Sequence, residues 1–506
     1  MNNEISNLEP KALWENFYAL TQIPRPSHYE EKVQEFVFNF GVNLGLETLK
    51  DDSGNIIIRK PATAGFEDRK GVILQAHLDM VPQKNSDKKH DFATDPIETY
   101  VDEDWVKANG TTLGADNGIG AAAAMAVLAA KNLEHGPIEA LFTATEETGM
   151  DGAEGLKAGI MQGEIMLNTD SEDEGELYVG CAGGEDLTVE FQYKKKEMPK
   201  NLIGGRLSVT GLKGGHSGMD IILQRANANK VFFRLLNIAH EKCGVRLISI
   251  DGGSLRNAIP REAFGLVAVK KKKWEKLVRL VKKEAKIICK EFELTEPDMK
   301  ILLEPEDAIA KLIDKRTQIH LTKSILACPN GVIRMSDGMP GLVETSTNLA
   351  VVKSDAKHKT IRLQFLMRSS VDSVKADLGN RMKALFSLAG GKVKFSGAYP
   401  GWNPNMESPI LKTMLATYEK KYGKVPEIKA IHAGLECGIL GGTYPNWDMI
   451  SFGPTIRFPH SPDEKVNIPS VAKFWDFLVE TLKNIPVKDV EIATKEDSEE
   501  DEDSEV

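Results

Sequence analysis

The segment Leu74-Gln75-Ala76-His77-Leu78-Asp79-Met80-Val81-Pro82 organises the rest of the chain. It continues a short apolar run that begins at Gly71, of the kind that fills a buried parallel strand. The run ends in a histidine and an aspartate two positions apart, so on an extended chain both side chains point to the same face. An imidazole that binds a metal through one nitrogen needs its other N–H held, and a nearby carboxylate is the usual partner. Alone, the pair is equally compatible with a histidine that ends a strand beside a solvated aspartate.

Length and composition bound the class of protein. The chain has 506 residues, of which 41% are apolar, enough for sizeable cores and too many for one ordinary domain, so we expect two domains. The net charge is −10, and the excess is concentrated in the sequence from Lys495 onward, which is too acidic and too poor in apolar residues to fold. We therefore expect residues 488–506 to form a disordered acidic tail without chemistry of its own.

Cysteine usage and hydropathy indicate the compartment. The 5 cysteines are widely spaced and form no C-x-x-C pair, as is typical of a reduced intracellular protein. The first ten residues are polar and acidic, so we expect no signal peptide. No apolar stretch approaches the ~18 residues that a membrane helix needs. These features predict a soluble, cytoplasmic protein without membrane contact.

The pattern of elements divides the chain. Predicted strands at 56–58, 71–77, 138–145 and 165–167 alternate with helices, which indicates an α/β fold with a central, mostly parallel sheet. After residue 185 the residues alternate between apolar and polar, as in antiparallel strands with one wet face, and lysine-rich helices follow. The α/β pattern returns near residue 403. We predict a discontinuous domain at 1–185 and 403–487, with an α+β domain inserted at 186–402 that is long enough for two similar halves, although no sequence repeat shows them.

A helix signal precedes the first predicted strand. Ser27-His28-Tyr29-Glu30 has the spacing of a capping box, in which serine and glutamate side chains bind the free N–H groups of a helix start. We therefore expect a helix that runs from this motif through about residue 46.

Carboxylates and histidines follow the predicted strands, where the sites of open α/β sheets lie. Six residues share such a position, at a strand end or in the glycine-rich loop that opens a helix: His77, Asp116, Glu146, Glu147, Asp170 and His460. This mixed nitrogen and oxygen set suits zinc, cobalt or manganese. So many carboxylates cannot crowd together without cations, because some would otherwise stay protonated. The sequence therefore predicts two divalent ions, with Asp116 as their natural bridge.

The adjacent Glu146 and Glu147 need different roles. One can bind a metal ion while its neighbour contacts water. A divalent ion lowers the pKa of bound water towards ~7, so that a carboxylate can take its proton at neutral pH. This division of a ligand and a base points to metal-assisted hydrolysis.

Five segments resemble the metal-binding segments of the co-catalytic zinc peptidases related to bacterial glutamate carboxypeptidase and aminoacylase: His77-x-Asp79, Gly114-Ala115-Asp116-Asn117-Gly118, Glu146-Glu147-Thr148-Gly149, Asn168-Thr169-Asp170 and His460. Four further segments resemble the members of this family that cleave aminoacyl-histidine dipeptides: Gly214-Gly215-His216-Ser217-Gly218, residues 255–262, Met367-Arg368-Ser369-Ser370 and His432-Ala433-Gly434-Leu435-Glu436-Cys437. The resemblance covers about residues 10–485, every metal position of the family is occupied, and only the acidic tail departs from it.

The resemblance implies a zinc-peptidase catalytic domain with an inserted lid domain, and it implies the ligands of two zinc ions. The first zinc would be bound by His77, Asp116 and Asp170. The second would be bound by Asp116, Glu147 and His460. By the same resemblance, Asp79 would orient His77, and Glu146 would be the general base.

For the lid, the resemblance implies substrate contacts. His216 would polarise the scissile carbonyl, since the oxyanion needs a donor beyond the metals, although the glycine-rich segment around it could simply be a turn. Asn257 and Arg368 would help to hold the substrate, because a guanidinium suits a terminal carboxylate. A surface salt bridge is the alternative for Arg368. Glu436 would meet the substrate's amino terminus.

The implied activity is hydrolysis of dipeptides, including Xaa-His dipeptides, and the implied partners are these substrates. The sequence leaves open whether two copies of the chain pair through the lid as a homodimer. The alternatives on the same scaffold are a tripeptide aminopeptidase and an N-acyl amino acid amidohydrolase. A peptide-binding protein that has lost catalysis would lack a ligand or the base, and all are present. Nucleic-acid binding is not expected, because the lysine run at 270–273 belongs to an amphipathic helix and the whole chain is acidic.

Overall fold

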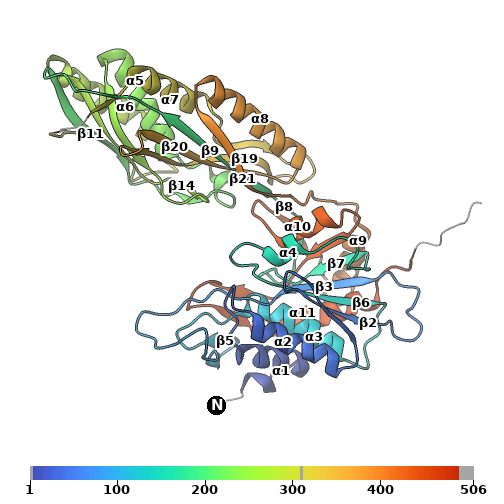
Figure 1. Cartoon of the computed structure of the whole chain (residues 1–506). Coiled ribbons are helices and arrows are strands. Elements are labelled where there is room, and N and C mark those ends of the chain that lie inside the picture. Colours follow the sequence, from blue (N-terminus) through green and yellow to red (C-terminus); the bar gives the residue numbers. More distant parts are fainter. Residues whose placement is uncertain (1–3, 308–310, 489–506) are drawn as a thin grey trace, which may run out of the picture.

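The computed structural model describes residues 4–307 and 311–488, so the predicted acidic tail lies outside the described residues except for Lys488. Figure 1 shows two lobes, each built around its own sheet. The chain leaves the first lobe after β8 (Glu176–Cys181), enters the second with β9 (Gly183–Gln192), and returns after β21 (Lys392–Tyr399). We keep the division into residues 1–185 with 403–487 and residues 186–402 as our proposal for the domains, called here the catalytic domain and the lid.

The sheet of the catalytic domain has eight strands in the order β1-β2-β6-β3-β7-β23-β8-β22. Its strands are β1 (Glu47–Lys50), β2 (Ile56–Lys60), β3 (Val72–His77), β6 (Ile138–Thr143), β7 (Ile165–Asn168), β8, β22 (Glu427–Ile431) and β23 (Asp448–Ser451). The central pairs β6–β3, β3–β7 and β7–β23 are parallel, whereas β1 and β2 join antiparallel at one edge. The predicted α/β class with a mostly parallel centre is therefore confirmed.

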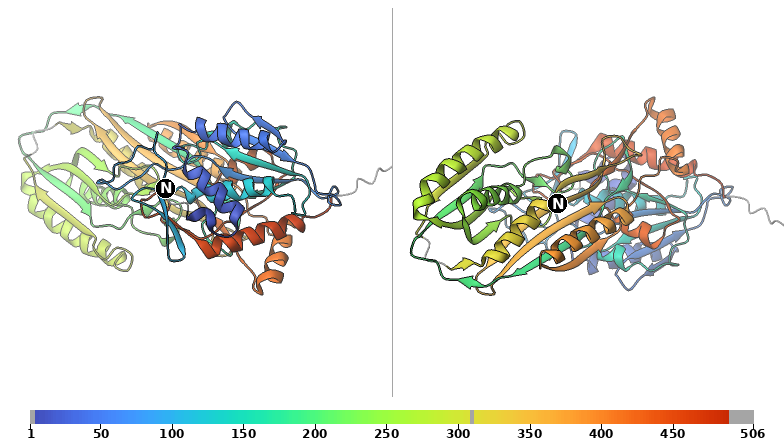
Figure 2. Two further views of the ribbon diagram at one scale, coloured as in Figure 1. Left: turned by 90° about the horizontal axis from the view of Figure 1, so that it is seen from below. Right: turned by 90° about the horizontal axis from the view of Figure 1, so that it is seen from above.

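Helices cover both faces of this sheet (Figures 1 and 2). One face carries α1 (Lys11–Thr21), α2 (Glu31–Asn43), α3 (Ala115–Ala129), α9 (Pro409–Tyr422) and α11 (Ile468–Lys483), and the other carries α4 (Asp151–Gly155) and α10 (Glu436–Thr443). The side chains of β3 alternate between the two cores, since Leu74 joins the first and Ile73 the second. This double burial explains why Val72, Ile73, Leu74 and Ala76 are apolar whichever face they point to.

A small four-stranded sheet places the late histidine segment beside the catalytic domain's centre. It has the order β24-β25-β5-β4 and consists of β4 (Thr99–Asp102), β5 (Trp105–Ala108), β24 (Ile456–Arg457) and β25 (Lys465–Asn467). The loop between β24 and β25 carries His460. Within the described ranges, no helix is both long and apolar enough to cross a membrane.

The lid sheet has nine strands that pair antiparallel, and its helices cover one face (Figure 1). Its strands are β9, β11 (Leu202–Thr210), β13 (Arg246–Gly252), β15 (Ala263–Lys270), β16 (Lys300–Pro305), β18 (Gly331–Met335), β19 (Val343–Asp355), β20 (Thr360–Ser369) and β21. Its helices are α5 (Ala228–Cys243), α6 (Trp274–Glu291), α7 (Lys315–Ala327) and α8 (Asp372–Leu388). Short pairs join β10 (Lys195–Lys196) to β17 (Leu312–Ile313) and β12 (Gly215–His216) to β14 (Ala258–Ile259).

The lid contains two similar halves, for which the sequence left room without showing a repeat. The first half runs β11-α5-β13-β15-α6-β16 and the second runs β9-α7-β19-β20-α8-β21. Their strands lie in the orders β16-β11-β15-β13 and β21-β9-β20-β19, which is the same β-α-β-β-α-β arrangement. The first half is inserted between β9 and α7 of the second, so a search for consecutive repeats misses the relation.

The predicted capping box is wrong. Helix α2 begins at Glu31, and Glu30, at its N-cap, makes no capping hydrogen bond with its side chain. The Ser27 hydroxyl instead donates to the Asp79 carboxylate at 2.7 Å, and Glu30 accepts from the Thr145 hydroxyl at 2.8 Å. Asp79 is fully buried, and a buried carboxylate requires donors more than an exposed helix start does. Ser27 and Glu30 therefore hold the segments that follow the central strands β3 and β6.

Candidate metal centre and active site

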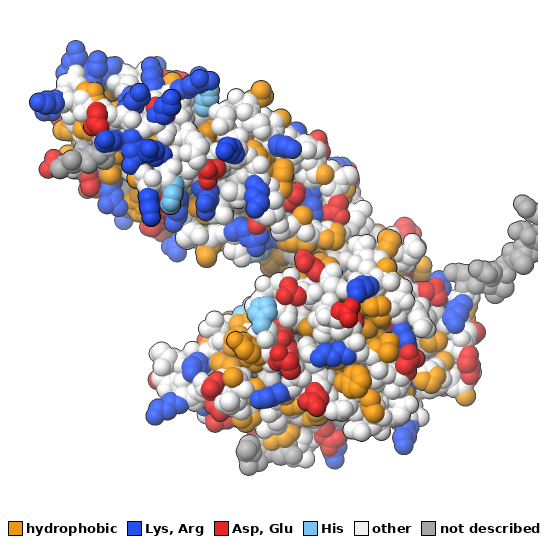
Figure 3. Space-filling view, viewed as in Figure 1, with side chains coloured by type: hydrophobic (Ala, Val, Ile, Leu, Met, Phe, Trp, Pro, Cys, Tyr) orange, Lys and Arg blue, Asp and Glu red, His pale blue; other side chains and the backbone are white. Residues whose placement is uncertain are grey.

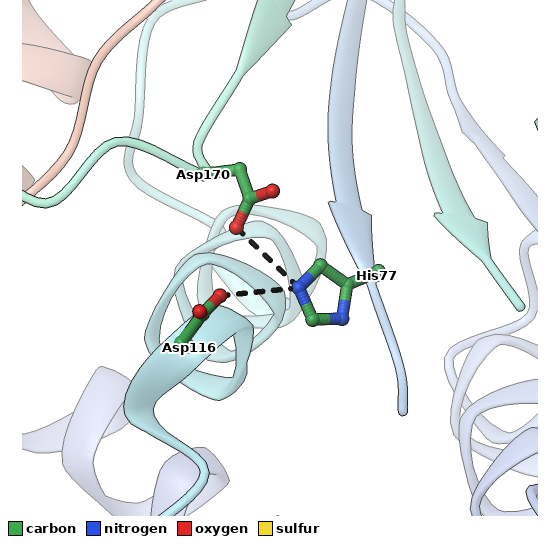
Figure 4. Close-up of side chains that lie close together, drawn as sticks. All are labelled: His77, Asp116 and Asp170. Atoms are coloured by element: carbon green, nitrogen blue, oxygen red, sulfur yellow. Dashed lines mark hydrogen bonds and ion pairs between the residues drawn. The ribbon is translucent and has the colours of Figure 1, made fainter. Parts of the chain in front are cut away.

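The structure brings the first predicted ligand group together at the carboxyl ends of β3 and β7. Figure 4 shows His77, at the end of β3, facing Asp116 and Asp170. The Nε2 atom of His77 lies 3.2 Å from Asp116 Oδ1 and 3.5 Å from Asp170 Oδ1. One donor atom from each residue lies within 4.8 Å of the others, a spacing that a single metal ion can bridge.

A second group lies on the other side of Asp116. The Nε2 atom of His460 is 3.3 Å from Asp116 Oδ2 and 2.9 Å from Glu147 Oε2. Asp116 thus presents Oδ1 to the first group and Oδ2 to the second. This is the arrangement expected of a carboxylate shared by two ions.

The donor set fits divalent cations. Burial raises the pKa of Asp170 to about 6, with Asp116 adding to the rise and His77 opposing it. Burial likewise raises the pKa of Glu146 well above its usual value, and neighbouring carboxylates add to the effect. Oxygen Oε1 of Glu147 is buried and has no hydrogen-bond partner among the described residues. Buried acids that repel one another, beside an unpartnered oxygen, indicate a site built for positive charge.

Asp79 lies where a residue that orients His77 is required. Its backbone carbonyl lies 3.1 Å and its Oδ1 3.4 Å from Nδ1 of His77, the ring nitrogen that points away from Asp116 and Asp170. The same carboxylate accepts the backbone N–H groups of Glu146 at 2.9 Å and Glu147 at 3.1 Å. Burial alone would raise the pKa of Asp79, but the hydrogen bonds from His77, Ser27 and the Glu146 N–H lower it to about 2. Asp79 therefore links the end of β3 to the loop that carries both glutamates.

The two adjacent glutamates occupy different places. Glu147 contacts His460, whereas the Glu146 carboxylate makes no hydrogen bond or ion pair within the described chain. One carboxylate oxygen of Glu146, one of Glu147 and a ring nitrogen of His77 all lie within 4.8 Å of one another. Glu147 therefore lies beside another predicted metal ligand, whereas the Glu146 carboxylate is free to accept a proton.

Two residues of this site were missed by the sequence analysis. Arg25 is 2% exposed and donates to the carbonyl oxygens of Leu78, Asp79 and Gly114. Glu464, also 2% exposed, accepts the backbone N–H groups in front of α3. An arginine between two prolines and a glutamate in a polar loop have no local pattern that could have revealed these contacts.

The lid residues form a cluster of their own. Nδ1 of His216 accepts the N–H groups of Gly218 at 3.3 Å and Met219 at 3.0 Å, and its Nε2 lies 3.5 Å from Nη2 of Arg368. Arg368 is 5% exposed and donates to the Tyr399 hydroxyl at 3.0 Å. Burial and the charge of Arg368 lower the pKa of His216, which favours the neutral imidazole.

Asn257 and a second histidine lie beside this cluster. The Asn257 carbonyl accepts the N–H of Ser217 at 2.8 Å, and its side chain is exposed. His432, which the sequence analysis gave no role, is buried between the domains, with Nε2 2.7 Å from the Ser346 hydroxyl of β19. Burial lowers the pKa of His432 to about 3, so it stays uncharged. The cluster therefore lies where catalytic domain and lid meet.

The structure does not bring the lid cluster to the metal centre. Figure 3 shows a deep hollow between the two lobes. No hydrogen bond or ion pair joins His216 to the metal-ligand side chains within residues 4–307 and 311–488. The predicted contact between His216 and a substrate therefore stays a prediction.

Glu436 lies beneath the site. It is 2% exposed, and its Oε2 accepts from Gln75 at 2.6 Å and from Thr143 at 2.8 Å. Its Oε1 has no hydrogen-bond partner within the described chain, and burial raises the pKa of this carboxyl to about 7. The contact between Glu436 and a substrate's amino terminus stays a prediction.

This combination of fold and donor set is that of a metallopeptidase. The chain belongs to peptidase family M20/M25/M40, whose model matches residues 73–484, and the resemblance noted from the sequence motifs is confirmed. The cytosol non-specific dipeptidase of Escherichia coli is 47% identical over 486 residues, which cover 96% of this chain and 100% of that protein. The crystal structure of aminoacylhistidine dipeptidase from Vibrio alginolyticus superposes with a TM-score of 0.92 at 47% identity, covering 96% of this chain and 99% of that one. An aminopeptidase from Bacillus cereus, 17% identical with a TM-score of 0.60 over 94% of this chain and 99% of that one, shares the fold.

Proposed function

We propose that this metallopeptidase hydrolyses dipeptides, including Xaa-His dipeptides, with two divalent ions held by the catalytic domain. The observation that carries the proposal is Asp116, whose two carboxylate oxygens face two separate donor groups. The relatives from Escherichia coli and Vibrio alginolyticus, which are named as dipeptidases and are similar over nearly the whole chain, support the substrate class.

His77, Asp116 and Asp170 would hold one ion, and Asp116, Glu147 and His460 the other. Zinc is the ion we propose, with cobalt or manganese as substitutes that the same nitrogen and oxygen donors accept. When bound, the ions acidify water and polarise the scissile carbonyl. Asp79 keeps His77 Nδ1 protonated through its backbone carbonyl at 3.1 Å and its carboxylate at 3.4 Å, and thereby directs Nε2 to the metal position.

We assign the general base to Glu146. Its carboxylate has no hydrogen-bond partner of its own in the described chain, while its backbone is held by Asp79 at 2.9 Å. A carboxylate with a raised pKa accepts a proton from water more readily and can afterwards donate it to the leaving amine. The fixed backbone limits the positions from which Glu146 reaches that water.

In the lid, we propose that His216 donates a hydrogen bond to the developing oxyanion. Two backbone N–H groups bind its Nδ1, so the proton of the neutral ring is on Nε2. Arg368 Nη2, 3.5 Å from Nε2, is itself a donor and cannot accept this proton, which leaves it for the oxyanion. Arg368, with Asn257 beside it, would bind the substrate's terminal carboxylate. Glu436 stays a candidate for the amino terminus. For His216 to reach the metal centre, the lid must close, or the lid of a second copy of the chain must supply it.

The test combines metal analysis with a substrate panel of dipeptides, tripeptides and N-acyl amino acids. Chelation should abolish dipeptide hydrolysis, and zinc, cobalt or manganese should restore it. Unchanged turnover in a metal-free sample would contradict the proposal. Preference for tripeptides or N-acyl amino acids would keep the metal chemistry and replace the substrate class.

We further propose a cytoplasmic protein that pairs through its lid. The name of the Escherichia coli relative and the absence of C-x-x-C pairs support the location. All 5 cysteines are free thiols in the structure, as a reduced compartment requires. Sedimentation of the purified chain would test the pairing.

A further inference from the structure

The loop that carries the shared ligand is held by one buried carboxylate. Glu464 accepts four consecutive backbone N–H groups: Leu113 at 2.7 Å and Gly114 at 2.9 Å on Oε2, and Ala115 at 2.7 Å and Asp116 at 3.2 Å on Oε1. These are the last groups before and the first groups within α3. A single side chain thus determines the backbone path that leads into Asp116.

Arg25 holds the same loop from the other side. Its Nη2 donates to the Gly114 carbonyl at 2.5 Å, and its Nη1 donates to the carbonyls of Leu78 at 2.8 Å and Asp79 at 3.1 Å. The guanidinium therefore ties the end of β3, where His77 lies, to the loop in front of Asp116. A planar fork of N–H donors suits this bridge, which a single ammonium group cannot reproduce.

The backbone of the loop packs closely against the Arg25 side chain. Gly114 has a φ of 70°, which favours glycine, and a Cβ there would lie 2.6 Å from Arg25 Nη2. A Cβ at Gly118, in the first turn of α3, would meet the same nitrogen at 2.6 Å. The backbone at Gly114 and Gly118 therefore packs directly against the guanidinium, with no room for a side chain.

Asp116 needs such a support because its carboxylate has to stay in contact with two donor groups at once. Its oxygens lie 3.2 Å from His77 Nε2 and 3.3 Å from His460 Nε2, on opposite sides. A rotation that improves one contact lengthens the other. We infer that Arg25 and Glu464 are positioning residues that hold Asp116 as the ligand common to both ions. This inference rests on the metal centre of the proposed function.

The decisive variant is Glu464→Gln. An amide has one acceptor oxygen, and its NH2 group would face two of the four N–H donors, so the loop must shift. The control is Glu296→Gln in the lid, because Glu296 is 1% exposed and likewise accepts two backbone N–H groups, those of Lys213 at 2.7 Å and Ala226 at 3.2 Å. Both variants lose a buried carboxylate that holds backbone, but only one lies beside the metal ligands.

The measurement is cobalt binding by titration calorimetry, together with the visible and paramagnetic resonance spectra of the cobalt-loaded protein. We expect Glu464→Gln to bind cobalt about 10–100-fold more weakly, which is the usual loss when a residue that supports a metal ligand is substituted. The spectrum should change, and the magnetic coupling between the two ions should weaken. Glu296→Gln should bind cobalt as the wild type does, even where its stability falls. Glu464→Asp, which keeps two carboxylate oxygens, should bind more tightly than Glu464→Gln.

The outcomes separate this inference from the proposed function. If the wild type binds no divalent ion, the proposed metal centre fails. If it binds two ions and Glu464→Gln gives the same affinity and spectrum, only the positioning role is overturned. Should Glu464→Gln not fold, Arg25→Lys decides, because it keeps the charge and loses the fork. Wild-type cobalt binding by a folded Arg25→Lys would equally contradict the inference.

Discussion

The substitution Asp79→Asn tests how the end of β3 is coupled to the glutamate loop. Asp79 Oδ1 accepts the Glu146 N–H at 2.9 Å and faces His77, and Oδ2 accepts the Ser27 hydroxyl at 2.7 Å and the Glu147 N–H at 3.1 Å. Asparagine turns one of these oxygens into a donor. Whichever oxygen is replaced, one buried backbone N–H loses its acceptor, which costs about 1–3 kcal/mol.

The same substitution removes the negative charge that orients His77, so we expect metal affinity to fall about 10–100-fold. Denaturant unfolding of the chelated protein measures the first effect, and titration calorimetry with zinc measures the second. The folded-state pKa of Asp79 is about 2, below its usual ~3.9. The wild type should therefore have the larger free energy of unfolding above about pH 4. This difference from the variant should vanish as the pH falls through about 2, where Asp79 becomes protonated.

A matched control lies in the same domain, between β1 and β2. The Asp51 carboxylate accepts the N–H groups of Ser53 and Asn55, both at 2.9 Å. Because both N–H groups bind Oδ1, Asp51→Asn removes the acceptor of the Asn55 side-chain amide, which donates to Oδ2 at 2.7 Å. The variant should therefore lower stability and leave zinc affinity unchanged. If Asp79→Asn binds zinc as tightly as the wild type, Asp79 only braces the backbone and our account of His77 is refuted.

Three further variants test the roles assigned to the glutamate pair and to His216. Glu146→Gln should keep both ions and lower turnover by about 10²–10⁴-fold, because an amide cannot accept the proton, whereas Glu147→Gln should weaken metal binding. Metal analysis beside steady-state kinetics separates them, and the roles are reversed if both variants retain metal and only Glu147→Gln is inactive. His216→Ala should lower kcat about 10²–10³-fold with a smaller change in KM and unchanged metal content. Near-normal turnover would show that residues 214–218 are only a turn.

Hydrophobic patterning predicted strands β2, β3, β6 and β7 of the catalytic sheet and the edge where their donors gather, but it did not predict β1, β8 or β22. A strand buried on both faces is continuously apolar, and parallel strands end at one edge of a sheet, so His77 and Asp170 had to meet there. The residue types that follow these strands then restricted the chemistry to metal-assisted hydrolysis. Resemblance to a known family supplied the individual roles, which spacing could not.

Only the tertiary structure decided the contacts that lie far apart in the chain. Ser27 and Glu30 have the spacing of a local cap, yet they bind Asp79 and Thr145, which are 52 and 115 positions away. Glu464 binds a loop about 350 positions earlier. Such pairs leave no periodic signal, because a polar side chain in a loop takes whichever buried partner the fold brings to it. The chain's periodicity therefore specifies strands and helices, and the folded core selects which polar groups are buried together.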